Sequence, residues 1–192
     1  MKKFELTNEF ITNMFGTKLF RIRALVEFGD VEAGELGGYV EKESNLGHDD
    51  NAWVYDNAWV YGNARVYGDA QVSGDARVYD NAWVYGDAQV SGDARVCGNA
   101  LVYGDARVCG NGDYAYAHGF GSVNRTTTFF RLKDGGVGVR CGCFYGTLAQ
   151  FRDKIRETHG ESAIAEEYLD LAALMEKRFR RTGNEQKTEE ES

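Results

Sequence analysis

The sequence predicts a mainly β protein built around a short parallel β-helix with 18 residues in each coil. From Ala52 to Gly112, the unit Ala-x-Val-(Tyr/Ser/Cys)-(Gly/Asp)-(Asp/Asn) recurs every six residues. A longer period lies above it, because residues 70–87 recur as residues 88–105 with 15 of 18 positions identical. Fixed-period self-similarity is typical of solenoids in which each unit stacks on its neighbour. The two periods together predict three faces per coil.

Each position of the six-residue unit has a structural role. Ala and Val are one residue apart, so both side chains point to the same side of a strand, which is the inside of the coil. Val fills the core, and its β-branch suits an extended backbone. Ala is small enough for the corner of a narrow triangle. The Gly-Asp and Gly-Asn pairs mark the corners, where turn and left-handed conformations are needed.

The outward positions form columns, because residues 18 apart stack at the ~4.8 Å spacing of neighbouring strands. One column carries three tyrosines, and another carries a tryptophan beneath two arginines. Their members are Tyr67, Tyr85, Tyr103, Trp59, Arg77 and Arg95. Aromatic rings can stack a nucleotide base and guanidinium groups can bind its phosphate, so we predict that these columns bind a ligand. The alternative is that the tyrosines only stabilise the sheet by cross-strand packing.

Two corners of the predicted coil carry polar columns. One is expected to hold a ladder of side-chain amides formed by Asn63, Asn81 and Asn99. The other stacks three carboxylates, those of Asp69, Asp87 and Asp105. Like charges at strand spacing repel unless a cation lies between them, so this column is a candidate Ca²⁺ site. The alternative is three solvated turn residues. No organic cofactor is predicted.

The segments that flank the repeats are expected to close the ends of the coil. Ten hexads make only about three and a third coils, and open ends would expose apolar core and unpaired backbone. We therefore divide the chain into an N-terminal β cap (1–51), the β-helix (52–112), a C-terminal unit (113–181) and a disordered acidic tail (182–192). In the cap, residues 17–28 predict a strand, and the turn-rich residues after it predict an irregular first coil.

The C-terminal unit is predicted to combine a hairpin with helices. Residues 126–132 and 137–144 read as its two strands, with turn residues between them. Thr147 and Gln150 have the spacing of a capping box that begins a helix. Two helices are expected, at about 148–158 and 162–180.

Composition excludes several classes of protein. A net charge of −8 argues against DNA as a partner, because nucleic-acid-binding proteins usually carry a basic face. No apolar run approaches the ~20 residues that span a bilayer. The N-terminal residues lack the apolar region of a signal peptide, so we expect a cytoplasmic protein with reduced thiols, including those of Cys141 and Cys143.

The repeats resemble the hexapeptide-repeat family, whose members fold as left-handed β-helices and include trimeric acyltransferases and γ-class carbonic anhydrases. The segment from Asp30, Asp-Val-x-Ala-Gly-x-x-Gly-Gly-Tyr-Val-Glu, is similar to the start of bacterial and phage hexapeptide-repeat proteins. The later Thr-Thr-Phe-Phe-Arg and Cys-Gly-Cys-Phe-Tyr-Gly-Thr segments are similar to proteins of phages and prophages of Gram-positive bacteria. The resemblance implies a left-handed coil and a phage or prophage accessory protein, and it brings no catalytic residues.

The histidines of the chain do not fit either enzyme class of that family. An acyltransferase needs a histidine base and usually a loop that protrudes between coils, and a carbonic anhydrase needs three histidine ligands. Residues 52–112 contain no histidine and no insertion. The three histidines are dispersed in the flanks, at His48, His118 and His159. We therefore expect no catalytic residues.

The functional prediction is a non-enzymatic binding protein. We expect a counter-defence factor that binds a host immune protein or sequesters a nucleotide signal. Flat faces rich in Tyr and Trp also invite self-association, so a homodimer or homotrimer is expected. The alternatives are a scaffold whose repeats stack end to end and a hexapeptide-type acyltransferase, for which acetyl-coenzyme A binding is the test.

Overall fold

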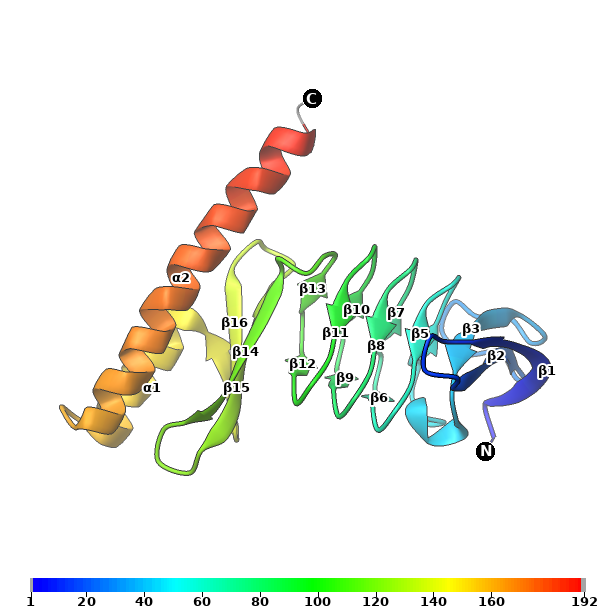
Figure 1. Cartoon of the computed structure of the whole chain (residues 1–192), viewed down its shortest axis with the longest axis horizontal. Helices are drawn as coiled ribbons and strands as arrows, with labels where there is room; N and C mark the ends of the chain where they lie inside the picture. The colour runs from blue at the N-terminus through cyan, green and yellow to red at the C-terminus, as the bar shows by residue number, and fades with distance from the viewer. Residues whose placement is uncertain (1, 191–192) are drawn as a thin grey trace. The chain divides into compact units, whose positions relative to one another are not determined.

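The chain consists of two compact units, Met1–Asn111 and Gly112–Ser192. The computed structural model describes the backbone of residues 2–190 and the side chains of residues 2–182. The first unit is a β-solenoid with an N-terminal β cap, and the second is an antiparallel sheet with two helices (Figure 1). This confirms the mainly β fold with a central solenoid that the repeats predict. The left-handed winding stays a prediction from the resemblance.

The solenoid has three faces, each a ladder of very short parallel strands. Face 1 contains β5 (Trp59–Val60), β8 (Arg77–Val78) and β11 (Arg95–Val96). Face 2 contains β6 (Arg65–Val66), β9 (Trp83–Tyr85) and β12 (Leu101–Tyr103). Face 3 contains β4 (Trp53–Val54), β7 (Gln71–Val72), β10 (Gln89–Val90) and β13 (Arg107–Val108). Val60 pairs with Val78 and Val72 with Val90, which confirms the 18-residue coil.

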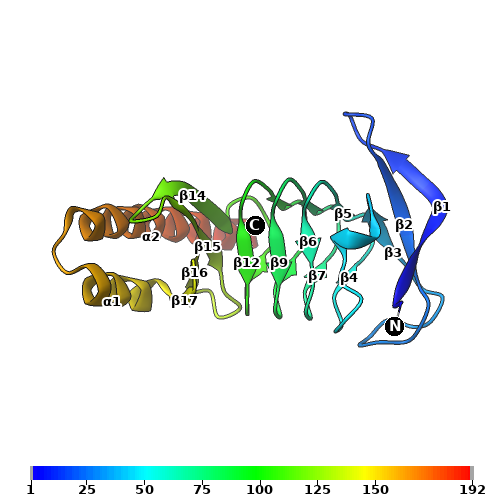
Figure 2. The ribbon, with the colours of Figure 1, turned by 90° about the horizontal axis from the view of Figure 1, so that it is seen from below.

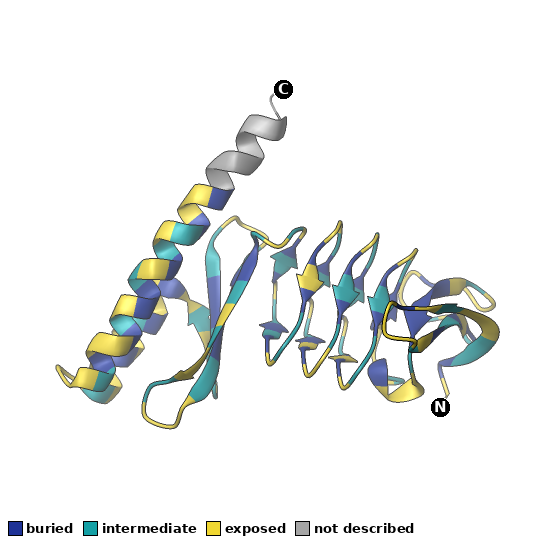
Figure 3. Ribbon diagram, viewed as in Figure 1, coloured by how far each residue is buried: buried dark blue, intermediate teal, exposed yellow. Residues whose placement is uncertain are grey.

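The core of the solenoid is made by the repeated alanines and valines. All of them, from Ala52 to Val108, are fully buried. Figure 3 shows buried residues recurring in every coil, whereas the outward residues vary between intermediate and exposed. Because the side chains that point inward are this small, a coil of three two-residue strands can close without a cavity.

The backbone conformation at the corners explains why the fifth position of the repeat is Gly in most hexads and Asp in two. From residue 56 to residue 104 this position has a positive φ, which glycine adopts at little cost. Asp56 and Asp80 occupy it with φ of 53° and 60°. The Asp56 carboxylate accepts the backbone N–H of Gly74 at 3.0 Å, and Asp80 accepts that of Gly98 at 3.1 Å. An aspartate therefore replaces glycine where its carboxylate can bond the next coil.

The predicted asparagine ladder is present at one corner. The Asn63 Nδ2 atom donates to Asn81 Oδ1 at 3.2 Å, and Asn81 Nδ2 is 3.4 Å from Asn99 Oδ1. Side-chain amides thus continue the hydrogen bonding of the coils outside the backbone ladders.

The N-terminal cap extends face 1 and supplies one further coil. Strand β2 (Lys18–Ala24) pairs antiparallel with β1 (Phe4–Thr12) and with β3 (Leu36–Val40), and β3 pairs in parallel with β5. A short 3₁₀ helix, η1 (Glu43–Asn45), then leads to Leu46, which pairs with Val66. The irregular first coil is therefore real, and the solenoid has about four coils. Figure 2 shows the β1–β2 hairpin reaching past the width of the coils.

Lys3 fastens the N-terminus to the first coil. Its side chain is only 3% exposed, and its Nζ donates to the carbonyls of Asp50 at 3.1 Å and Ala52 at 2.8 Å. The ammonium also lies 4.5 Å from the centre of the Phe28 ring. Burial lowers the pKa of Lys3 from its usual value near 10.5 to about 8, although the Asp50 carboxylate opposes the shift.

This buried amine predicts a pH dependence of stability. Between pH 8 and 10 the unfolded chain keeps the Lys3 proton while the folded chain releases it, so stability rises with pH in that window. The melting temperature of the first unit, followed by tryptophan fluorescence, is expected to rise from pH 8 to 10. A Lys3→Met variant is expected to lose that rise. Identical pH profiles for the two proteins would contradict this role of Lys3.

The second unit is a four-stranded antiparallel sheet with both helices on one face. Its strands, in sheet order, are β14 (Tyr114–Phe120), β15 (Arg125–Arg131), β16 (Val137–Cys141) and β17 (Phe144–Thr147). Helices α1 (Leu148–His159) and α2 (Ala163–Glu190) pack their apolar side chains on Phe129, Val139 and Cys141 (Figure 1). The Thr147–Gln150 capping box that begins α1 is confirmed. No helix in the described part of the chain is long and apolar enough to cross a membrane.

Two details of the second unit differ from the sequence prediction. The expected strand 137–144 is broken by a turn at Gly142 and Cys143, where Gly142 has a φ of 59°. The segment 182–192, expected to be disordered, is helical as far as Glu190 because α2 continues through it. Glu, Gln and Lys are good helix formers, so a helix already anchored by packing propagates into them. The side chains after Thr182 lie outside the described residues.

Candidate functional site

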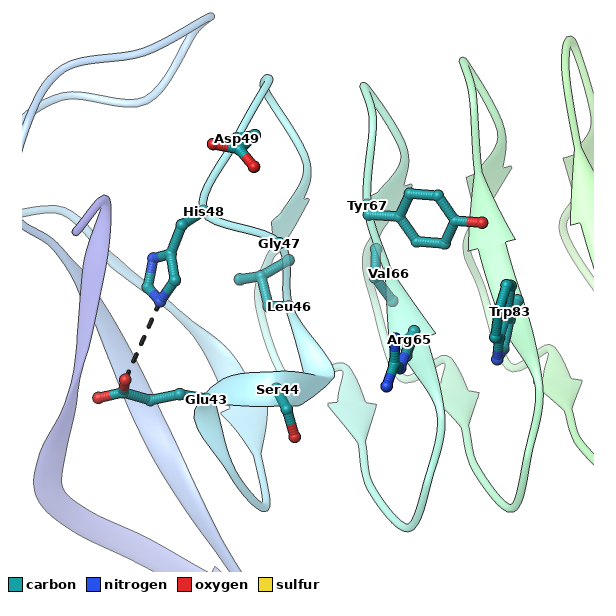
Figure 4. A pocket seen from close by; sticks show the side chains of 10 residues that line it. All are labelled: Glu43, Ser44, Leu46, Gly47, His48, Asp49, Arg65, Val66, Tyr67 and Trp83. Carbon is teal, nitrogen blue, oxygen red and sulfur yellow. Dashed lines mark ion pairs between the residues drawn. The ribbon is translucent and has the colours of Figure 1, made fainter. Parts of the chain in front are cut away.

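A groove of about 660 Å³ lies on face 2, next to the first coil (Figure 4). One wall is η1 and the loop after it, with Glu43, Ser44, His48 and Asp49. The other wall is made by outward side chains of the next two coils, Arg65, Tyr67 and Trp83. The groove therefore combines an irregular segment with the regular columns of the solenoid.

The loop exists because the first coil is two residues longer than the others. Val40 pairs with Val60 and Leu46 with Val66, 20 positions apart, whereas Val54 pairs with Val72, 18 positions apart. The extra residues fall between Leu46 and Val54. They carry the chain outward at His48 and Asp49, which line the groove.

Gly47 leaves room where the tyrosine column begins. The Gly47 N–H donates to the Val66 carbonyl at 2.8 Å, so Gly47 is the first-coil counterpart of Tyr67. Tyr67 and Tyr85 stack at 4.9 Å between ring centres, and Tyr85 and Tyr103 at 4.4 Å. A glycine at the first step of this column has no ring to place there. The absent side chain is one reason why the surface is hollow at this point.

Asn45 holds the loop in place from beneath. It is fully buried, and its Nδ2 donates to the carbonyls of Gly62 at 3.2 Å and Ala64 at 2.8 Å. In the regular coils such carbonyls accept backbone N–H groups, as when Asp80 accepts from Asn63. Its Oδ1 accepts the Lys42 N–H at 2.9 Å. One side chain thus replaces backbone donors that η1 cannot supply.

Arg65 and Trp83 form the cationic and aromatic part of the groove. The Arg65 guanidinium lies 5.7 Å from the centre of the Trp83 ring, and that side chain is 39% exposed. The Tyr67 ring meets Trp83 edge to face at 6.0 Å. No other charged side chain that lines the groove is basic. Planar rings and anionic groups are the chemistry that such a pair recognises.

His48 is held in the groove wall by contacts with Lys3, Phe4 and Glu43. The His48 Nδ1 atom accepts the Lys3 N–H at 3.2 Å, and the ring stacks on Phe4 at 4.4 Å. Its Nε2 faces Glu43 Oε2 at 4.0 Å, the dashed contact in Figure 4. Burial lowers the pKa of His48, and the Lys3 and Lys2 charges add to that shift. The hydrogen bond at Nδ1 and the stacking on Phe4 therefore make His48 a part of the wall that positions the loop.

The structure divides the six predicted ligand-binding residues between two faces. Tyr67 lines the groove, and Tyr85 and Tyr103 continue its column along face 2. Trp59, Arg77 and Arg95 lie on face 1.

On face 1, the Arg77 guanidinium covers the Trp59 ring at 4.2 Å. These two residues line a separate hollow of about 400 Å³ together with Tyr39 and Ile11. The tyrosine column of face 2 and the Trp59–Arg77 column of face 1 lie on two faces of the coil with a corner between them. They therefore cannot bind the same small ligand.

The sequence pattern did not predict that Trp83, Glu43, His48 and Asp49 belong to one site. The available signal was the break in the six-residue pattern before Ala52, which places a polar loop beside the first regular coil. Nothing in the spacing shows on which face that loop emerges.

The aspartate column lies on one corner of the coil, and its calcium site stays a prediction. Asp69 and Asp87 line a hollow of about 250 Å³ on the corner beside face 3. Asp69 Oδ1 already accepts the Asn51 Nδ2 at 2.7 Å. Within the described residues no three His, Cys, Asp or Glu side chains come together as metal ligands, and this holds for Asp105 as well. Each coil contributes one outward carboxylate to this corner, and the position before Asp69 in the column is the amide Asn51. Calcium usually takes about six to eight oxygen ligands, so further ligands would have to come from water.

Comparison with known proteins supports the solenoid and no particular activity. Residues 58–72, 70–86, 88–100 and 94–110 match the family model described as the YdcK beta solenoid repeat. The match lies within the regular coils, so it supports a repeat β-solenoid protein. No curated protein gives a significant match to the chain.

Proposed function

We propose that this chain is a non-enzymatic binding protein that holds a small ligand in the face-2 groove. The observation that carries the proposal is the meeting of Arg65, Tyr67 and Trp83 in one groove on a rigid scaffold. Sites that bind small molecules are concave, largely preformed and furnished with a few polar groups on an apolar or aromatic surface. The groove has this composition.

A nucleotide is the ligand class that we propose. Its base would lie against Trp83 and Tyr67, where stacking contributes about 1–3 kcal/mol per base. Its phosphate would pair with Arg65. Glu43 and Asp49, on the opposite wall, are acceptors for ribose hydroxyl groups. An extended anion such as a nucleic acid is disfavoured by those same carboxylates.

Sequestration fits this site better than catalysis. The imidazole of His48 accepts the Lys3 N–H at Nδ1 and stacks on Phe4, so it is held as part of the groove wall and is not a free imidazole base. A hexapeptide-type acyltransferase needs such a base. A protein that binds a nucleotide signal and withholds it needs only affinity. A counter-defence role in a phage or prophage is the setting that the resemblance of the flanking segments supports.

Calorimetry with a panel of cyclic and ADP-ribose-type nucleotides tests the proposal. Trp83→Ala and Arg65→Ala are each expected to weaken the binding of the responding nucleotide by roughly 5- to 150-fold. Trp59→Ala is the matched control, because it removes the same aromatic side chain from face 1 and should leave the affinity unchanged.

Two outcomes would overturn the nucleotide proposal. One is that no nucleotide of the panel binds the wild-type protein. The other is that Trp59→Ala weakens binding while Trp83→Ala does not, which would move the site to face 1. Acetyl-coenzyme A should not bind, and its turnover would favour the acyltransferase alternative.

An assembly scaffold is the second candidate, and the β1–β2 hairpin favours it. Met14 and Phe15, at the hairpin tip, are 88% and 80% exposed. Asn13 Oδ1 accepts the N–H groups of Phe15 and Thr17, so the apolar tip is rigid. Exposed apolar side chains on a rigid tip are suited to contact with another protein. A single small species in light scattering at high concentration would contradict the scaffold.

A further inference from the structure

The C-terminal unit contains a second cavity of about 490 Å³, far in sequence from the face-2 groove. It opens between α1 and the end of the sheet where β16 turns into β17. The volume is in the range of cavities that hold small molecules. All of its lining residues belong to the same compact unit.

The floor of this cavity is apolar and aromatic. Phe151, Ile155 and Tyr168 are all buried, and Phe144 lies 5.3 Å from Phe151 between ring centres. Tyr168 meets Phe151 edge to face at 5.9 Å. A ligand that enters the cavity therefore meets packed rings that are already in place.

The rim of the cavity is cationic in an otherwise acidic chain. Arg125, Lys154 and His159 line it, and none of its lining side chains is acidic, although the chain carries 30 acidic residues. Arg125 forms no ion pair within the described residues. Lys154 contacts Glu157 at 2.9 Å, but both side chains are more than half exposed, so the pair is weak in water. Both cations can therefore pair with an anion.

Gly142 sets the position of Arg125. A Cβ atom at Gly142 would lie 1.7 Å from Arg125 Nη1, so the guanidinium lies across the turn where that residue has no side chain. The φ of 59° also favours glycine at this turn. Cys141 and Cys143, the neighbours of Gly142 in the chain, also line the cavity.

Tyr168 adds a polar donor inside the cavity. Its hydroxyl lies 3.9 Å from the Cys141 Sγ, which accepts the Thr127 hydroxyl at 3.1 Å. Burial, together with the nearby Cys141 thiol, raises the pKa of Tyr168 to about 12. The phenol keeps its proton at neutral pH and can donate a hydrogen bond to a ligand.

We infer that this cavity binds a small organic anion with an aromatic or acyl body. The charged oxygen group pairs with Arg125 and Lys154, and the apolar body covers Phe144, Phe151 and Ile155. This site does not depend on the proposed function, because it shares no residue with the face-2 groove.

The aromatic sulfonate 1-anilinonaphthalene-8-sulfonate is a suitable probe, and its neutral parent N-phenyl-1-naphthylamine tests the role of charge. Arg125→Gln and Lys154→Gln are expected to weaken sulfonate binding, Arg125→Gln by at least about tenfold. Both variants should bind the neutral parent within about twofold of wild type. Arg156→Gln is the control, because Arg156 lies on α1 outside the cavity and pairs with Asp153. Lys154 is half exposed, so its variant tests the inference even if Arg125→Gln does not fold.

Thiol labelling shows where the probe binds. Cys143 is exposed and lines the cavity, whereas Cys109 is exposed in the other unit. Saturating sulfonate should slow alkylation of Cys143 and leave that of Cys109 unchanged, as measured by peptide mass mapping. Unchanged Cys143 alkylation, or wild-type sulfonate affinity in both variants, would overturn the inference.

Discussion

Replacing Asn45 with alanine is expected to lower the free energy of unfolding of the first unit by about 4 kcal/mol. The substitution leaves the carbonyls of Gly62 and Ala64 without their donor and the Lys42 N–H without its acceptor. Each buried polar group that loses its partner costs roughly 1–3 kcal/mol. All three tryptophans of the chain, Trp53, Trp59 and Trp83, lie in this unit. Urea denaturation followed by tryptophan fluorescence therefore reports this loss alone.

Two further variants separate the causes of this effect. Asn45→Asp keeps an acceptor for Lys42 but buries a carboxylate against the two carbonyl oxygens, so it should be at least as destabilised as the alanine variant. Asn63→Ala removes an amide of the same size from the exposed ladder and should change stability by less than about 1 kcal/mol. If Asn45→Ala and Asn63→Ala have the same stability, the first coil does not depend on this side chain.

The loop that Asn45 supports is also the wall of the face-2 groove. Glu43, Ser44 and His48 are its near neighbours in the chain and line the groove. A first coil without its buried amide would lose that wall before it lost the regular coils, because each coil of a solenoid contacts only its neighbours. Asn45→Ala should therefore lower affinity for the groove ligand even where the protein is still folded.

The regular coils could be read from the sequence, whereas the site could not. Val60, Val78 and Val96 show their stacking directly, because the six-residue pattern sets both the inward direction and the register. The tyrosine column and the asparagine ladder follow from the same register. The face-2 groove depends instead on two extra residues after Leu46, and a hexad pattern carries no information where it is broken.

The second unit shows the same limit for a different reason. The Thr147 cap of α1 and the apolar stripe of α2 are local signals, and they predicted the two helices. The turn at Gly142 depends on the contact between that glycine and Arg125, which lies in another strand. Such a contact between distant residues is invisible to periodicity, so residues 137–144 read as one strand.

Gly38→Ala is the second substitution with a large expected effect. A Cβ atom at Gly38 would lie 2.6 Å from the Ala58 carbonyl oxygen, 2.7 Å from Val54 Cγ1 and 2.9 Å from the Tyr55 carbonyl oxygen. The Ala58 carbonyl accepts the Tyr39 N–H at 2.9 Å, so it cannot move without breaking the ladder that joins the cap to the coils. We expect a loss of about 3 kcal/mol or more, measured by urea denaturation with tryptophan fluorescence.

Gly47→Ala is the matched control, because it adds the same methyl group to the same coil. Its Cβ would lie 3.1 Å from the Cβ of Tyr67, a contact that a local shift of a few tenths of an ångström relieves. We expect less than about 1 kcal/mol of destabilisation. The new methyl group enters the lining of the face-2 groove, so ligand affinity should fall although the fold persists. Equal stability of the Gly38 and Gly47 variants would show that the cap does not pack on the coils as closely as these distances require.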